Sequence, residues 1–287
     1  MPIGGQFYFT IYRRLRAVLL VRPDIFASIG LQNQNSKISD NSVVLNWITT
    51  YPEHRKSGLF LMADRLLACQ QTKPLKTGET WDHYFPYDAS HVRSAMDSKS
   101  SFVTFLRYSL HRPRNVLAML AIQKENFIEQ ERPDRSVFTG KDFESPAFTR
   151  KYSDYLIGEV KDLMSFYHAD EDFQLFVKFF QYLDGKSRFT YKEYLYAFSS
   201  FRKFLEKNSD HTPRFCDTSD SFLQFLYDLD VLGYVVDTNE GPFFGWCHHE
   251  RSTSNIAPKV KTHVRYDIHY GLMKALWLGK RFKQKKL

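Results

Sequence analysis

The chain has 287 residues, of which 43% are hydrophobic and 16% aromatic, and its formal net charge is +8. This composition supplies ample apolar surface for the core of one large domain or of two ordinary ones. No apolar run approaches the roughly 18 to 20 residues of a membrane span, and the three widely spaced cysteines do not form the pattern of a disulfide framework. We therefore expect a cytoplasmic protein that does not cross a membrane.

The N-terminal part contains two candidate strands. RAVLLV at residues 16–21 is a short apolar run of the kind that forms a fully buried strand, and SVVLNWI at residues 42–48 is a second candidate. Two strands do not make a doubly wound sheet. We therefore expect either that the first strand pairs with a sheet outside this chain, or that the sequence is the later part of something larger.

Helical periodicity dominates the residues that follow. Apolar residues recur every three or four positions along residues 102–110, and Pro113 suits the first turn of a helix because its missing N–H would be unpaired there. The stretch from Arg132 to Pro146 is polar and contains proline. It predicts a domain boundary that divides the chain into residues 1–146 and 147–287.

The tripeptide GKS at residues 185–187 matches the end of the P-loop signature, which holds nucleotide phosphates. A P-loop needs a further glycine five residues before Gly185, where this chain has Phe180. We expect instead that Gly185 ends a helix and that Thr190 and Glu193 form a capping box for the next one. The chain then has no phosphate loop, so we expect that ATP and magnesium would require a partner or a missing N-terminal region that carries one.

The segments after residue 146 follow the order of a winged-helix domain. YKEYLYAFSSFRKFLEK and SDSFLQFLYDLDVL predict helices, and GYVVD and FFGWCHH predict two strands joined by the turn TNEG. We therefore expect a mainly helical fold, in which a residual α/β ATPase strand and a helical lid precede a winged-helix domain.

Winged helices that read DNA place their third helix in the major groove. The charged residues of that helix are all acidic here, namely Asp217, Asp220, Asp228 and Asp230, and they would repel a polyanion. A protein-facing or intramolecular role is therefore favoured, and a DNA-binding module is the alternative. If the chain does not bind DNA, we expect the C-terminal tail to be a solvated terminus. The basic residues that would serve DNA binding lie on the preceding helix and in this tail: Arg202, Lys203, Lys207, Lys280, Arg281, Lys283, Lys285 and Lys286.

Cys247, His248 and His249 stand next to one another, and His263 and His269 follow. Because we expect residues 248 and 249 on a strand, the two side chains would point to opposite faces. The paired spacings of structural zinc sites are also absent. We therefore predict no metal site, and no constellation of residues indicates a catalytic site within this chain.

Arginines occur at two positions where other folds bind phosphate. Arg22 follows the first predicted strand, at the end where ligands of open α/β sheets lie, and Asp24 is close by. Arg112 and Arg114 flank Pro113 at a helix start, where unpaired N–H groups favour anions. We take these four charged residues as candidates for nucleotide sensing. The alternative is that they form local ion pairs.

Four segments resemble successive parts of one family, the Fun(Z)-type proteins of P2-like phages and prophages, which look like P-loop ATPases of the STAND and AAA-like group. The segments are RAVLLVRPDIFASIGLQNQNSK, SVVLNWITTY, LHRPRNVLAML and SNIAPKVKTHVRYDIHYGLMKAL. The likeness extends over nearly the whole chain but matches only the later part of the family's pattern, without its Walker A and Walker B segments. It implies that Arg22 ends a strand of an ATPase core and that residues 112–114 lie in a helical lid.

The resemblance implies a regulatory and interaction region of a prophage-encoded ATPase that does not hydrolyse ATP by itself. It also implies a protein partner, or an ATPase half that carries the P-loop, and a role connected with phages, such as phage defence. A remnant without function is a further alternative.

Overall fold

The computed structural model describes residues 18–21, 32–33, 36, 40, 42–43, 45–89, 100–129, 135–165, 168–209, 212–239, 241–252, 255 and 257–279. By its internal contacts the chain divides into two compact units. One unit comprises residues 1–43 and 253–256, and the other comprises residues 44–252 and 257–287.

Neither predicted N-terminal strand is found among the described residues. Residues 18–21 have no regular secondary structure, and the side chains of Val18, Leu19 and Leu20 are 87%, 82% and 92% exposed. The described part of residues 42–48 is also without a strand. An apolar run forms a strand only when a neighbour completes its ladder of hydrogen bonds, and none of the described residues pairs with either run.

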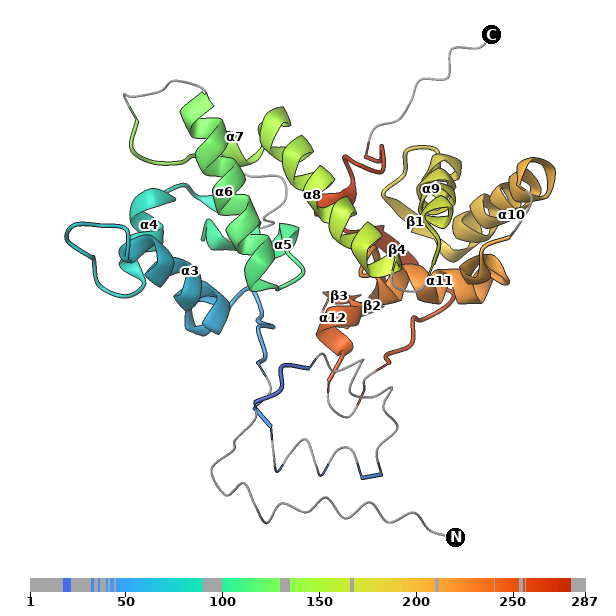
Figure 1. The fold of residues 1–287 in the computed structure, drawn as a ribbon, viewed down its shortest axis with the longest axis horizontal. Coiled ribbons are helices and arrows are strands. Elements are labelled where there is room, and N and C mark those ends of the chain that lie inside the picture. Colours follow the sequence, from blue (N-terminus) through green and yellow to red (C-terminus); the bar gives the residue numbers. More distant parts are fainter. Residues whose placement is uncertain are drawn as a thin grey trace, which may run out of the picture. The chain divides into compact units, whose positions relative to one another are not determined.

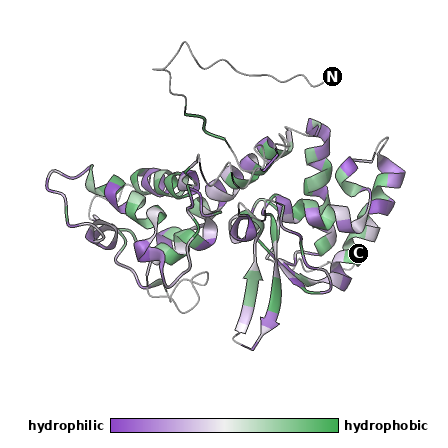
Figure 2. Cartoon of the chain, turned by 90° about the horizontal axis from the view of Figure 1, so that it is seen from below, coloured by the Kyte–Doolittle hydropathy of each residue, from purple (hydrophilic) through white to green (hydrophobic). Residues whose placement is uncertain are grey.

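The second unit is mainly helical, as the sequence predicts (Figure 1). Its α-helices are α3 (Gly58–Ala68), α4 (Glu79–Tyr84), α5 (Phe102–Tyr108), α6 (Pro113–Glu129), α7 (Gly140–Phe143), α8 (Pro146–Ser165), α9 (Asp170–Phe179), α10 (Tyr191–Asn208), α11 (Ser219–Asp228) and α12 (Cys247–Glu250). Short 3-10 segments occur at η1 (His54–Lys56), η3 (Phe180–Leu183), η4 (Arg214–Cys216) and η5 (Tyr270–Leu272). Hydrophobic and hydrophilic residues alternate along the helices in Figure 2, as expected of helices that bury one face. Within the described ranges, no helix has both the length and the hydrophobicity needed to cross a bilayer.

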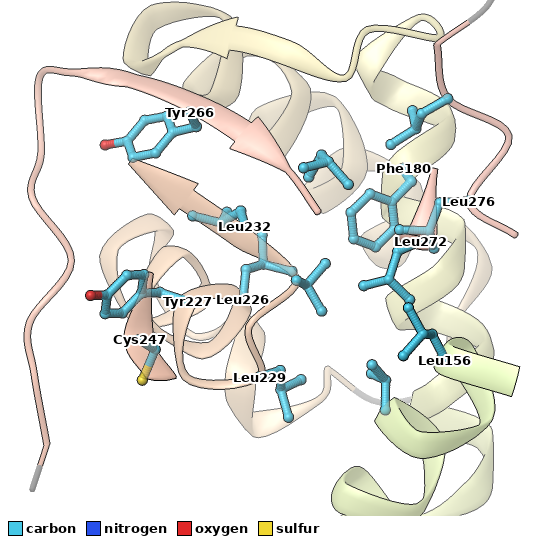
Figure 3. Close-up of a cluster of buried hydrophobic side chains, with 14 of the residues drawn as sticks. Leu156, Phe180, Leu226, Tyr227, Leu229, Leu232, Cys247, Tyr266, Leu272 and Leu276 are labelled. Carbon is cyan, nitrogen blue, oxygen red and sulfur yellow. The ribbon is translucent and has the colours of Figure 1, made fainter. Parts of the chain in front are cut away.

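Aromatic rings form much of the core of this unit. The ring of Phe179 lies edge-on to the rings of Tyr194, Phe201 and Phe222, at centroid distances of 6.1, 5.8 and 4.7 Å. Such edge-to-face pairs are a favoured arrangement of aromatic side chains. Aliphatic side chains from α8, α11, β2 and the C-terminal segment gather in the part of the core drawn in Figure 3, among them Leu156, Leu226, Leu232, Leu272 and Leu276.

Four antiparallel strands form a small sheet in the order β1-β4-β2-β3. The strands are β1 (Arg188–Thr190), β2 (Leu232–Thr238), β3 (Gly241–Gly245) and β4 (Arg265–Ile268). The hairpin of β2 and β3 corresponds to the two predicted strands, whereas the sequence did not predict β4, which lies between β1 and β2. Strand β3 ends at Gly245, Trp246 has no regular secondary structure, and α12 begins at Cys247. The prediction that FFGWCHH is a strand throughout is therefore wrong for its last four residues.

The GKS tripeptide lies in a turn, as predicted. Asp184 and Gly185 both adopt the left-handed conformation after η3, with φ angles of 51° and 72°. The capping box is also confirmed, because Thr190 accepts a hydrogen bond from the Glu193 amide while the Glu193 side chain accepts one from the Thr190 amide. The ammonium group of Lys186 lies 2.7 Å from the Glu193 carboxylate. This lysine therefore pairs with the capping-box glutamate in the first turn of α10.

The predicted domain boundary coincides with the first residue of α8, Pro146. Helix α8 packs against α6, which precedes the boundary in the sequence, and both helices belong to the second compact unit. The division into residues 1–146 and 147–287 stays a prediction.

Candidate functional site around Asp230

Segments that are far apart in the sequence meet around Asp230 in the second unit. Asp230 lies just beyond the end of α11, two of the other residues directly precede α6, two lie on α12, and one follows β4. The six residues of this polar cluster are His111, Arg112, Asp230, His248, His249 and His269.

Two left-handed residues shape the backbone at this site. His111 and Asp230 have φ angles of 50° and 57°. The His111 amide donates to the hydroxyl group of Ser109, and the Leu110 amide donates to the side-chain oxygen of Asn115 in the first turn of α6. Aspartate tolerates the left-handed region better than most residues. The turn after α11 therefore suits Asp230, and hydrogen bonds from its own neighbours hold the turn before α6.

Asp230 is the carboxylate of the cluster and is buried, with 1% of its surface exposed. Its Oδ1 atom accepts hydrogen bonds from the backbone amide and the Nδ1 atom of His248, each at 2.9 Å. Its Oδ2 atom lies 3.6 Å from Nη2 of Arg112. Burial alone would raise the pKa of Asp230, but the charges of His248 and Arg112 and the hydrogen bonds from His248 outweigh it and lower the pKa to about 2. The carboxylate is therefore ionised and paired inside the protein.

His269 closes the site on the side of β4. Its Nε2–H group donates to the Ser109 carbonyl oxygen at 3.2 Å, whereas its buried Nδ1 atom has no hydrogen-bond partner among the described residues. The ring also lies edge-on to Trp246, with centroids 5.5 Å apart. Burial, with the charge of His248 acting in the same direction, lowers the pKa of His269 to about 4. His269 is therefore a neutral imidazole at physiological pH.

Three further imidazole rings lie next to one another at the edge of the cluster. One ring nitrogen each of His111, His248 and His249 lies within 4.8 Å of the other two, which is close enough for a shared metal ion. The Nε2 atoms of His111 and His249 are 3.3 Å apart. Loss of hydration between the rings, together with the neighbouring charge of His248, lowers the pKa of His249 to about 3 and that of His111 well below its usual value. These two rings are therefore neutral and available as ligands.

Helix α12 is held in place by the carboxylate of Glu250. This group accepts hydrogen bonds from the hydroxyl groups of Tyr227, at 2.6 Å, and of Tyr234. Tyr227 lies on α11 and Tyr234 on β2, so that α12 is bound to two separate elements. The positions of His248 and His249 are fixed by these contacts.

The prediction that His248 and His249 face opposite sides is wrong, because both residues lie on α12 and not on a strand. A single helical turn can direct neighbouring side chains toward one partner, here His111. Cys247 belongs to the same turn but is buried, and burial raises the pKa of its thiol to about 12. The ligand group that the structure brings together thus contains histidines and not Cys247.

The arginines proposed from the sequence have carboxylate partners. Arg112 pairs with Asp230, and Arg114, whose side chain is 71% exposed, lies 3.4 Å from Glu159. These contacts are the local ion pairs that stand as the alternative to nucleotide sensing. Arg22 and Asp24 lie outside the described residues.

No family model, curated protein or solved structure matches this chain. Its function is therefore inferred from the residues of the site and from the resemblance carried by the four segments.

The basic residues of the nucleic-acid alternative fall into two groups. Arg202, Lys203 and Lys207 lie on α10, where Arg202 donates a hydrogen bond to the Cys216 carbonyl oxygen at 2.9 Å. Lys203 and Lys207 are exposed. The remaining residues are outside the described part of the chain: Lys280, Arg281, Lys283, Lys285 and Lys286.

Proposed function

We propose that this chain is the lid and winged-helix region of a prophage-encoded P-loop ATPase and that it regulates the ATPase without hydrolysing ATP by itself. The observation that carries the proposal is the contact between Arg112 and Asp230. Arg112 lies in the segment that resembles the lid, and Asp230 follows the helix that corresponds to the third helix of the winged-helix order. A buried charge thus links the two regions that such a regulator has to couple.

The strand pairing supports a winged-helix interpretation in a modified form. The expected order is helix, strand, helix, helix, strand, wing and strand. If β4 is taken as the last strand, β1, β2 and β4 fit this order, and β4 pairs with both of the others. Strand β3 and α12 then belong to an enlarged wing. In this interpretation the histidines of α12 are part of the wing.

A nucleotide phosphate could act on this link through Arg112. The side chain of Arg112 is 32% exposed, so that one side of its guanidinium group can meet an anion while the other side faces Asp230. A phosphate that draws Arg112 away leaves the buried carboxylate with its two hydrogen bonds from His248 and without the guanidinium group. Because an unpaired buried charge is costly, the segments around Asp230 would then rearrange. Arg114 is an additional contact, since its exposed pair with Glu159 is weak.

The proposal predicts a partner that supplies the phosphate loop, and co-expression tests it. The full chain is produced with the product of the reading frame immediately upstream, and ATP turnover is measured for each protein and for the pair. We expect turnover only when a P-loop protein is present, and we expect the substitutions Arg22→Ala, Arg112→Ala and Arg114→Ala to change it. Arg55→Ala is the control, because Arg55 pairs with Asp82 elsewhere in the unit.

Two outcomes would contradict the proposal. One is turnover by the isolated chain that survives Arg22→Ala and Arg114→Ala. The other is an upstream product without a Walker A motif, together with a chain that binds DNA with an affinity that falls steeply with salt and is lost on deletion of residues 280–287. The second outcome would favour the DNA-binding alternative.

A further inference from the structure

The distances between His111, His248 and His249 match those of a metal-binding site. Zinc–imidazole bonds of about 2.0 to 2.1 Å at tetrahedral angles place two ligand nitrogens about 3.3 to 3.4 Å apart. The Nε2 atoms of His111 and His249 are already separated by 3.3 Å. A nitrogen of His248 lies within 4.8 Å of both, so that a small rotation of its ring would complete a set of three ligands.

The surroundings of His248 are those of a metal ligand. Its Nδ1 atom contacts the buried carboxylate of Asp230, which leaves Nε2 for another partner. A carboxylate on the far nitrogen of an imidazole fixes the orientation of the ring and makes the other nitrogen a better donor, and most metal-binding histidines have such a partner. Asp230 also offsets the positive charge of Arg112, which would otherwise oppose a cation nearby.

We propose that His111, His248 and His249 bind one divalent zinc ion through their imidazole nitrogens. Borderline cations such as zinc prefer imidazole, whereas magnesium and calcium prefer oxygen ligands. His111 is 6% exposed and His249 is exposed, so the site is closed on the side of α6 and open toward solvent. The fourth position of the ion would be taken by water. The metal site shares Asp230 with the proposed nucleotide-sensing link, but its three ligands and its test do not depend on that proposal.

Binding of the ion requires one proton to move. The Thr49 amide donates to Nδ1 of His111 at 3.3 Å, which places the proton of the neutral His111 ring on Nε2 in the metal-free chain. When Nε2 binds zinc, this proton has to lie on Nδ1, and the contact with the Thr49 amide breaks. The site therefore predicts a change at Thr49, which is not itself a ligand.

The test uses the full chain without a polyhistidine tag, freed of metal and titrated with zinc. Affinity and stoichiometry are measured by calorimetry, and cobalt is used as a spectroscopic substitute because its visible spectrum distinguishes tetrahedral coordination. The variants are His249→Ala and His249→Gln, which alter an exposed ligand. The controls are His83→Ala and Cys69→Ser, which remove an exposed histidine and an exposed cysteine outside the cluster.

We expect one zinc ion per chain and a tetrahedral cobalt spectrum in the wild type and in both controls. Loss of a residue that is hydrogen-bonded to a metal ligand weakens metal binding about 10- to 100-fold. We therefore expect loss of a ligand itself, in the His249 variants, to weaken zinc binding at least about 100-fold. Hydrogen exchange at the Thr49 amide should become faster when zinc is added. The proposal is overturned if zinc does not bind stoichiometrically, or if both folded His249 variants bind it as tightly as the wild type.

Discussion

The guanidinium group of Arg112, just before α6, lies 3.6 Å from the carboxylate of Asp230, just after α11. The same carboxylate accepts two hydrogen bonds from His248, so that one buried charge joins the start of α6, the end of α11 and α12. A buried ion pair is weak evidence for stability, but removal of one partner is costly because the other stays buried. The contribution of Asp230 should therefore be visible when its charge alone is removed.

The first prediction concerns Asp230→Asn. Asparagine tolerates the left-handed conformation at this position, so that the substitution removes the charge without straining the backbone. We expect the free energy of unfolding to fall by about 2 to 3 kcal/mol, because Arg112 and His248 lose a charged acceptor. Urea unfolding followed by circular dichroism measures this change.

A matched control is Asp237→Asn, which also removes an aspartate from an arginine pair. Asp237 pairs with Arg265 at 2.6 Å, but both side chains are more than half exposed, at 76% and 55%. Exposed pairs contribute less than about 1 kcal/mol. If both substitutions lower the free energy of unfolding equally, the buried charge of Asp230 contributes no more to stability than the exposed charge of Asp237.

The second prediction concerns pH and His269. The imidazole has a pKa of about 6.5 in an unfolded chain, whereas burial lowers the pKa of His269 to about 4 in the folded protein. Between these values the unfolded chain binds a proton that the folded chain does not, so stability falls as the pH is lowered from about 6.5 to about 4. One such group contributes a slope of about 1.4 kcal/mol per pH unit.

His269→Gln should reduce this slope, because glutamine does not take up a proton. The control is His83→Gln, which changes an exposed histidine on α4 and should keep the slope. Unfolding is best compared between pH 5 and 6.5, since burial raises the pKa of Asp228 and Asp267 and these groups act in the opposite direction at lower pH. An unchanged slope in His269→Gln would mean that His269 does not carry the effect.

The sequence predicted those features that depend on neighbouring residues. The start of α6 at Pro113 and the capping box of Thr190 and Glu193 are both found in the structure. Each of these is decided within one helical turn, where the side chain and the amide that it caps are only a few positions apart. Local chemistry is sufficient for such elements.

Features that depend on distant contacts were missed. The RYDI segment at β4 alternates polar and apolar residues over only four positions, and it forms a strand because β1 and β2 lie on either side of it. In α6, the apolar Leu117 is 40% exposed while the polar Asn115 is buried and donates a hydrogen bond to Glu159. Tertiary hydrogen bonds can turn a polar residue inward against its own preference.

The histidine cluster could not be predicted from spacing, because His111 is far from His248 and His249 in the sequence. The only local signal was the adjacent pair of histidines, and it was interpreted as part of a strand. Helix α12 replaces the strand because the carboxylate of Glu250 is held by Tyr227 and Tyr234. The site thus depends on a contact that the fold provides.

The third prediction concerns the turn that contains GKS. Thr190→Ala removes the hydroxyl group that caps α10, and we expect it to lower the free energy of unfolding by about 1 kcal/mol. Lys186→Ala should change stability by less, because Lys186 and Glu193 form an exposed pair. If Lys186 were a P-loop lysine, its loss would instead weaken ATP binding by the chain, and a nucleotide-binding assay on the same variants separates the two interpretations.

The fourth prediction concerns Gly245, the last residue of β3. A methyl group at this position would overlap the ring of Tyr234, and that ring is fixed because its hydroxyl group is bound to Glu250. We expect Gly245→Ala to lower the free energy of unfolding by about 1 to 3 kcal/mol.

Gly158→Ala is the matched control, since a methyl group there meets no atom within 4 Å and lies inside α8. It should stabilise the protein by about 0.5 to 1 kcal/mol, because alanine favours a helix over glycine. Thermal unfolding measures both changes. Equal effects of the two substitutions would mean that the Tyr234 ring can move away from residue 245. The hydrogen bond from Tyr234 to Glu250 would then not fix the position of α12.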